Sequence, residues 1–271
     1  MPLPSLCESV AIRETLQYLY TRQSRIAVVA VSVDYTRGFI KPNQNPPAAK
    51  MAASSSAGLL QQASSIDAQA RTSLLRPDPQ LDHALTNSAT NGLPAITISD
   101  LQGQYLAVQC QLINAKSVLE IGTLGGYSTI WFARTGAKVT SLEINPKHRD
   151  VALENTKGLD VEIILGAALD VLPKLAAEGR KFDFIFIDAA WEEQWQYFQW
   201  AVKLARVNGC IYVDNVIREL LETENVGEGK ESLVTKVGRE EKVSATLVPV
   251  ISSHKGKVEE MYDGFLLAVI K

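Results

Sequence analysis

Three side chains that can bind a metal ion follow two apolar, strand-like runs in the second half of the sequence. Asp188 follows the run 182–187, and Asp214 and Asn215 follow the run 210–213. Parallel strands joined by one helix usually lie side by side, so we expect these three side chains to converge at the carboxyl edge of a sheet. Two carboxylates and an amide oxygen suit Mg²⁺, which keeps its other coordination positions for water and substrate. We predict a divalent-cation site at Asp188, Asp214 and Asn215; acids that only cap helices or turns are the alternative.

A glycine-rich turn lies earlier in the chain. Gly122, Gly125 and Gly126 follow an apolar run, and a stretch with helical spacing, 127–134, comes next. Glycines let the backbone pass close under a ligand because no Cβ is in the way, and the following helix directs its positive N-terminal end to the same place. The next β-rich run ends on Glu143, whose carboxylate can accept both hydroxyls of a ribose. This order of elements predicts half of a nucleotide-binding βαβ unit.

The spacing of the turn favours one ligand over another. A dinucleotide fingerprint is G-x-G-x-x-G, whereas this turn reads Gly122-x-x-Gly125-Gly126. Glu120, just before the turn, would repel a phosphate but suits a cationic ammonium or sulfonium group. Both observations favour S-adenosylmethionine (SAM) over NAD, so an NAD-dependent oxidoreductase is the less favoured hypothesis. A plain α/β crossover whose glycines serve only tight packing is the structural alternative.

Two motifs resemble one family. The segment E-I-G-T-x-x-G-Y-S, residues 120–128, followed by L-E-I-N-P, residues 142–146, resembles the cation-dependent O-methyltransferases, which include catechol and caffeoyl-CoA O-methyltransferases. The similarity is strongest to their small bacterial and fungal members and covers roughly residues 81–271. The resemblance implies a SAM- and divalent-cation-dependent O-methyltransferase that acts on a small aromatic vicinal diol, a catechol-like acceptor.

The resemblance also implies the cofactor contacts. They come from a loop segment before residue 100, from the glycine turn and the start of its helix, and from the ends of later strands. The predicted cofactor-binding residues are Ile98, Glu120, Gly122, Thr123, Tyr127, Ser128, Glu143, Ala168 and Asp188. The family places its metal on the residues that match Asp188, Asp214 and Asn215.

The sequence departs from the family pattern directly after Asp188. The family usually reads Asp-Ala-Asp-Lys, with the lysine as a base near the reacting hydroxyl, whereas this chain reads Asp-Ala-Ala-Trp and has Trp191 at the lysine position. No catalytic base can therefore be assigned. Trp191, with Trp195 and Phe198, has the spacing of one apolar helix face, so we expect it to pack; an aromatic wall for a flat acceptor is the other interpretation. A SAM-binding relative with weakened or lost transfer is the alternative function.

Alternating helical and strand-like runs surround these motifs. Strands are expected at 118–121, 138–142, 161–165, 182–187 and 210–213, with helices of 10–15 residues between most of them. This alternation predicts an α/β fold with a doubly wound, mostly parallel sheet. The resemblance implies a Rossmann-like class I SAM methyltransferase with seven strands, the last of which, 265–270, is antiparallel. It also implies that N-terminal helices cover the site.

Composition limits the remaining options. The chain has 271 residues, of which 46% are hydrophobic, and a formal net charge of −3, so nothing indicates nucleic-acid binding. Residues 26–33 are too few to span a membrane. Three scattered cysteines favour a reducing, cytoplasmic setting, and the acids among residues 1–50 argue against a mitochondrial presequence. We interpret 1–50 as an appendage, either disordered or due to a mis-set start codon, and 51–271 as the enzyme domain.

Two further expectations concern partners and histidines. Relatives in the family often form dimers, so a homodimer is one expected arrangement. His83, His148 and His254 have no partners at metal-ligand spacing, and we expect each to be a surface or capping residue.

Overall fold

The computed structural model describes residues 56–227, 229–258 and 260–271. Residues 1–50, interpreted above as an appendage, lie outside the described residues, so that interpretation stays a prediction. The strands are β1 (Ser117–Ile121), β2 (Lys138–Glu143), β3 (Val161–Leu165), β4 (Phe182–Ile187), β5 (Ala205–Val213), β6 (Val243–Ile251) and β7 (Tyr262–Ile270). The helices are α1 (Ser56–Leu74), α2 (Pro79–Thr90), α3 (Asp100–Leu112), α4 (Tyr127–Ala133), α5 (Pro146–Asn155), α6 (Ala168–Ala177), α7 (Gln194–Leu204), α8 (Val216–Glu222) and α9 (Leu233–Val237).

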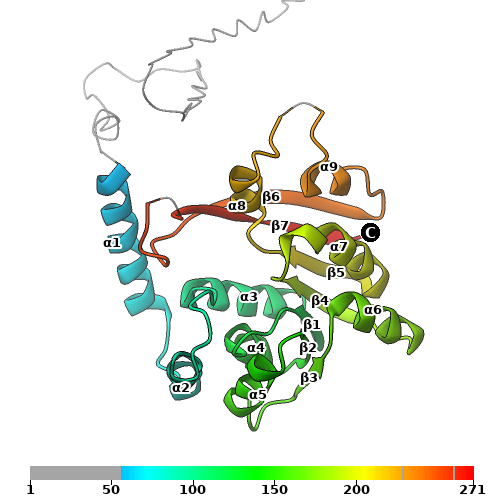
Figure 1. Ribbon diagram of the computed structural model, residues 1–271, viewed down its shortest axis with the longest axis horizontal. Coiled ribbons are helices and arrows are strands. Elements are labelled where there is room, and N and C mark those ends of the chain that lie inside the picture. The colour runs from blue at the N-terminus through cyan, green and yellow to red at the C-terminus, as the bar shows by residue number, and fades with distance from the viewer. Residues whose placement is uncertain (1–55, 228, 259) are drawn as a thin grey trace, which may run out of the picture. The chain divides into compact units, whose positions relative to one another are not determined.

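The strands form one seven-stranded sheet in the order β3-β2-β1-β4-β5-β7-β6. Neighbours from β3 to β5 pair in parallel, and β7 pairs antiparallel with both β5 and β6. The predicted fold class and the predicted antiparallel last strand are therefore confirmed. Because β1 and β4 are neighbours at the centre of the sheet, the loops that follow them lie at the same edge (Figure 1).

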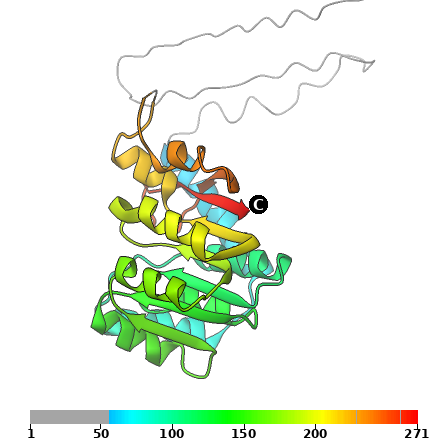
Figure 2. The same ribbon diagram turned by 90° about the vertical axis from the view of Figure 1, so that its right-hand side faces the viewer.

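Helices cover both faces of the sheet, as Figure 2 shows. Alternate residues of β4 enter opposite cores: Phe184 and Phe186 pack with α3 and α4, whereas Ile185 and Ile187 pack with α6 and α7. All four of these side chains are fully buried. A central parallel strand that is covered on both faces has to be apolar throughout, which explains its near-continuous hydrophobic sequence.

Polar caps fix where the helices around the site begin. Ser99 accepts a hydrogen bond from the backbone N of Gln102 and starts α3. Asn145 caps α5, with Pro146 as the first helical residue, directly after the acid that ends β2. These caps hold the loop before α3 and the end of β2 in place beside the glycine turn.

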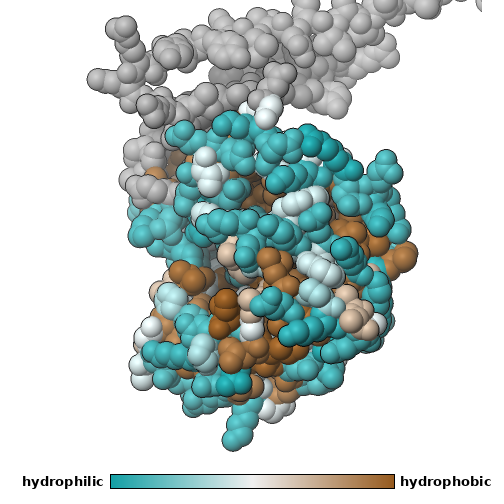
Figure 3. All heavy atoms as spheres, turned by 45° about the vertical axis from the view of Figure 1, so that its right-hand side comes forward, coloured by the Kyte–Doolittle hydropathy of each residue, from teal (hydrophilic) through white to brown (hydrophobic). Residues whose placement is uncertain are grey.

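Figure 3 shows a face on which hydrophilic residues surround smaller groups of hydrophobic ones. Single exposed apolar side chains are normal on a protein surface. Within the described part of the chain, the helices are too short or too polar to cross a membrane.

Candidate functional site

A cavity of about 450 Å³ opens where β1, β2 and β4 end, and we call it the turn cavity. The glycine turn, the end of β2 and the loop before α3 form its walls. It contains eight of the nine predicted cofactor-binding residues: Ile98, Gly122, Thr123, Tyr127, Ser128, Glu143, Ala168 and Asp188. Residues from both halves of the sheet thus surround one space, as expected at the carboxyl edge of an open α/β sheet.

Gly122 permits the close approach of the first and fourth strands. Its φ is +96°, and a Cβ on it would lie 2.0 Å from the backbone O of Asp188. Any other residue would push Asp188 away from the turn. This contact with Asp188, in addition to the space that a ligand needs, explains why a glycine is required at position 122.

Glu143 is held by the backbone of the turn. Its carboxylate accepts hydrogen bonds from the N atoms of Leu124 at 2.8 Å and Thr123 at 3.3 Å, and from the N of Asn145 at 2.9 Å. The Nδ1 atom of His148 lies 3.7 Å from the same carboxylate, and His148 lines the turn cavity. We expected His148 to be only a surface or capping residue, but it also lies beside the carboxylate of Glu143.

Glu120 does not line the turn cavity. It is fully buried, and its carboxylate accepts hydrogen bonds from the hydroxyls of Ser128, Thr129 and Ser141. Burial, opposed by these hydrogen bonds, raises the pKa of Glu120 to about 7. The structure thus assigns Glu120 to the support of the turn, between β1, β2 and α4, and not to the walls of the cavity as the sequence predicted.

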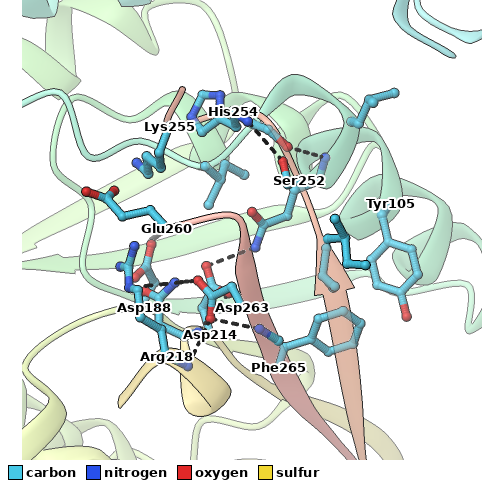
Figure 4. A pocket seen from close by; sticks show the side chains of 18 of the residues that line it. Tyr105, Asp188, Asp214, Arg218, Ser252, His254, Lys255, Glu260, Asp263 and Phe265 are labelled. Carbon is cyan, nitrogen blue, oxygen red and sulfur yellow. Dashed lines mark hydrogen bonds and ion pairs between the residues drawn. The ribbon is translucent and has the colours of Figure 1, made fainter. Parts of the chain in front are cut away.

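A second cavity of about 350 Å³ lies beside the first, and we call it the tail cavity (Figure 4). Helix α1, helix α3, the start of α8 and the connection from β6 to β7 contribute to its walls. Both cavities are lined by Asp188 and by residues 96–98. Two molecules, one bound in each cavity, would therefore meet beside Asp188.

The three predicted metal ligands all line the tail cavity. Asp214 is 6% exposed, and its Oδ2 accepts a hydrogen bond from Nε2 of Gln102 at 2.9 Å. Asn215 donates from Nδ2 to Asp263 at 2.8 Å, which leaves its amide oxygen as the free end of the side chain for a ligand. Nowhere in the described ranges do three or more His, Cys, Asp or Glu side chains gather as a metal-binding group. Two acids and one amide fit a hard cation only if water and substrate complete its coordination.

Both aspartates have raised pKa values. Burial, followed by the negative charge of Glu120, raises the pKa of Asp188 to about 6. Burial and the charge of Asp188 raise the pKa of Asp214 well above its usual value. Two buried carboxylates at one strand edge repel each other, and a cation between them would remove that cost. This electrostatic property fits a metal ion.

Aromatic rings from three elements line the tail cavity. The rings of Tyr212 and Phe265 stack with centroids 4.2 Å apart, and Tyr105 packs against Phe265 at 5.3 Å. These rings, and not Trp191, make an apolar surface for a flat molecule. No periodic pattern in the sequence indicates that these rings lie together, because they come from α3, β5 and β7.

Trp191 lies outside both cavities. It starts a short 3₁₀ turn, Trp191–Glu193, ahead of α7, so it is not on one helix face with Trp195 and Phe198 as predicted. It is half-buried, and the guanidinium of Arg218 lies 5.5 Å above its ring. Trp191 therefore packs, as expected, but against Arg218 and not within an apolar helix face, and the interpretation as an acceptor wall stays a prediction.

The sequence also missed the contribution of the C-terminal connection. His254 and Lys255 line the tail cavity, and the side chain of Asp67 in α1 accepts hydrogen bonds from the N and Oγ of Ser253 at 2.8 Å. His254 is exposed at the surface, as expected, but it also lines the tail cavity.

Comparisons with known proteins agree with this geometry. A family model described as "O-methyltransferase" matches residues 75–251. A catechol O-methyltransferase of Niastella koreensis is 43% identical over 69% of this chain and 89% of its own length, and O-methyltransferase imqG of Aspergillus flavus is 38% identical over 73% and 87%. The crystal structure of an O-methyltransferase from Bacillus cereus in complex with SAH is similar with a TM-score of 0.71 and 36% identity, and covers 78% of this chain and 100% of that one.

Proposed function

This chain belongs to the O-methyltransferase family and is a SAM-dependent O-methyltransferase, and we propose that it methylates one hydroxyl of a small aromatic vicinal diol with the help of a divalent cation. The observation that carries the proposal is the shared wall of the two cavities, where Asp188 and residues 96–98 line both. A donor in the turn cavity and an acceptor in the tail cavity would then face each other across that wall.

We assign SAM to the turn cavity. SAM, when bound, supplies an electrophilic methyl group on a sulfonium centre. Glu143 would accept the ribose hydroxyls, and the backbone N–H groups that bind its carboxylate keep it oriented. Gly122 lets the end of β1 lie against the backbone of Asp188 after β4, so that both strand ends border the cavity. These residues bind and orient the donor and take no part in proton transfer.

We assign the diol to the tail cavity. Asp188, Asp214 and Asn215 would hold a divalent cation, which, when bound, would bind adjacent oxygens and lower the pKa of a hydroxyl. The rings of Tyr105 and Phe265 offer a surface for the aromatic part of the acceptor. Orientation of the reacting hydroxyl toward the turn cavity is a large part of catalysis in such transfers.

An acceptor panel tests this assignment. The full chain is incubated with SAM, Mg²⁺ and one of three acceptors of similar size: catechol, resorcinol or phenol. We expect methyl transfer to catechol at a rate at least about tenfold above that for the other two, because only its two oxygens are adjacent. Equal rates for all three would contradict a vicinal-diol acceptor.

The relative with weakened or lost transfer remains the second candidate, because Trp191 stands where the family has its lysine. Tight SAM binding by calorimetry together with no methyl transfer to any diol of a wider panel would support it. Binding of SAM and turnover of catechol would reject it.

A further inference from the structure

Lys255 places an amine beside the meeting point of the two cavities. It lies in the connection between β6 and β7 and lines the tail cavity (Figure 4). Its Nζ donates a hydrogen bond to the carbonyl O of Thr97 at 3.2 Å, and Nε2 of His254 lies 3.0 Å from the same oxygen. Thr97 belongs to the segment that lines both cavities. The amine is therefore anchored where the acceptor would meet the donor.

The surroundings of Lys255 favour its neutral form. Burial and then the positive charge of Arg218 lower the pKa of the Lys255 amine, against the opposing effect of nearby acids. A lowered pKa increases the share of free amine at neutral pH, and a free amine can accept a proton. The charged groups that act on this amine are Arg218, Asp188, Glu260 and Asp214, and His254 shares its hydrogen-bond acceptor.

The two cavities hold no competing lysine. Among the described residues that line them, Lys255 is the single lysine, and Trp191 lies in neither. Asp188 and Asp214 are the groups to which the cation is assigned, so they cannot also act as free bases. His254 lies 3.0 Å from the same carbonyl oxygen, but it is exposed, whereas Lys255 is half-buried. The variants below separate the roles of the two residues.

We propose that Lys255 is the general base of the reaction, supplied by the C-terminal connection in place of the lysine that Trp191 replaces; the inference rests on the proposed function. The free amine takes the proton of one acceptor hydroxyl and becomes an ammonium, and the electron pair of the O–H bond stays on the oxygen. That oxygen forms the new bond to the methyl carbon of the donor, whose sulfur keeps the electrons of the broken C–S bond. The proton later leaves the ammonium to solvent.

Variants of two neighbouring lysines test the role. Lys255→Met removes the amine, Lys255→Arg keeps the positive charge but has no free base at assay pH, and Lys257→Met is the matched control from the same connection. We expect Lys255→Met and Lys255→Arg to lower kcat on catechol by about 10²–10⁴-fold. We expect Lys257→Met to stay within about threefold of the wild type. Unchanged SAH affinity by calorimetry shows that each variant is folded.

A second acceptor separates a base from a positioning residue. The nitro group of 4-nitrocatechol acidifies its hydroxyl, so that the acceptor is largely ionised before it binds. We expect the loss in Lys255→Met to shrink to less than about tenfold on this acceptor. An equal loss on both acceptors, full activity of Lys255→Arg, or a loss in His254→Gln instead of Lys255→Met would overturn the proposal.

A measurement without turnover tests the amine itself. The SAH-bound full chain is labelled with acetic anhydride across a pH series, and mass spectrometry follows Lys255 and Lys257. We expect the labelling midpoint of Lys255 to lie at lower pH than that of Lys257, and equal midpoints would overturn the proposal. A wild type that methylates neither acceptor overturns the proposed function and this inference with it. A wild type active on both acceptors and indifferent to changes at Lys255 overturns the inference alone.

Discussion

The turn cavity and the tail cavity are built in different ways. Strand ends and the loops that follow them supply most residues of the turn cavity, and its acid Glu143 is satisfied by three backbone N–H groups. In the tail cavity, α1, α3, α8 and the β6–β7 connection add residues to those of the strands, and the walls carry charges of both signs. The first cavity follows from the sheet itself, whereas the second depends on which side chains the surrounding segments supply.

This difference separates cofactor binding from acceptor choice. A change in the tail cavity can alter the acceptor or the rate without disturbing the strand ends that bind the donor. A change in the turn cavity disturbs donor binding whatever the acceptor is. The first two variants below are therefore each expected to affect one cavity and to spare the other, and the last two change residues that line neither cavity.

The largest effect is expected for Asp214→Ala in the tail cavity. Loss of an assigned metal ligand should lower turnover of catechol by at least about 100-fold, more than the change of a residue that only supports such ligands. The SAM dissociation constant, measured by calorimetry, should change by less than about threefold. Asp150→Ala, which removes an exposed acid that lines neither cavity, is the control. A large loss of SAM affinity in Asp214→Ala would show that the cavities are not independent.

The converse variant is Glu143→Ala in the turn cavity. It removes an acceptor of charge-assisted hydrogen bonds, each of which contributes about 1.5–3 kcal/mol, so SAM affinity should fall roughly 10–100-fold. Catechol turnover at saturating SAM should fall much less. Glu143→Gln keeps the shape of the side chain, so its SAM affinity should lie between that of the wild type and that of Glu143→Ala. Unchanged SAM affinity in a folded Glu143→Ala protein would remove the assignment of the turn cavity to SAM.

Glu120→Gln tests the support beneath the turn. Burial raises the pKa of Glu120 to about 7, so the folded protein holds a proton that the unfolded chain releases near pH 4. Stability is therefore lost as pH rises from about 4 to about 7, and the Gln variant avoids this loss. We expect the free energy of unfolding of Glu120→Gln, relative to wild type, to rise by on the order of 2 kcal/mol between pH 5 and pH 8. Denaturant unfolding at both pH values measures it, and a constant difference would contradict a protonatable Glu120.

The smallest effect is expected at Trp191, which lines neither cavity. Trp191→Ala removes a contact with the Arg218 guanidinium that contributes about 0.5–1 kcal/mol at a partly exposed site. Stability should fall by about that amount, and both SAM affinity and catechol turnover should stay within about threefold. Trp191→Lys should not accelerate the reaction, because the new amine would be attached at a position that lines neither cavity. A faster Trp191→Lys enzyme would show that the family position is still within reach of the acceptor.

The same contrast explains what the sequence could predict. The turn cavity was predictable because its residues follow strands at short, fixed spacings, as Gly122 and Glu143 do. Asp188, Asp214 and Asn215 were predictable because neighbouring parallel strands bring their ends together. The direction in which the Glu120 side chain points was not predictable, because an acid before a turn can point either to a ligand or to hydroxyls on the next strand.

The rest of the tail cavity could not be predicted. Tyr105, Arg218 and Lys255 come from three segments far apart in the chain, and their meeting depends on how α1 and the β6–β7 connection pack over the sheet edge. No local spacing carries that information. Trp191 was assigned to the wrong element for a related reason, because the helical spacing of Trp191, Trp195 and Phe198 begins three residues before the regular helix starts.

The most direct test of the central claim is the metal dependence of methyl transfer. The full chain is assayed with SAM and catechol in excess EDTA and again after Mg²⁺ is added in excess over the chelator, with SAM affinity measured under both conditions. The account predicts loss of turnover in EDTA, recovery with Mg²⁺ and nearly constant SAM affinity, because we assign the cation to three residues that line the tail cavity. Full turnover of catechol in EDTA would contradict it.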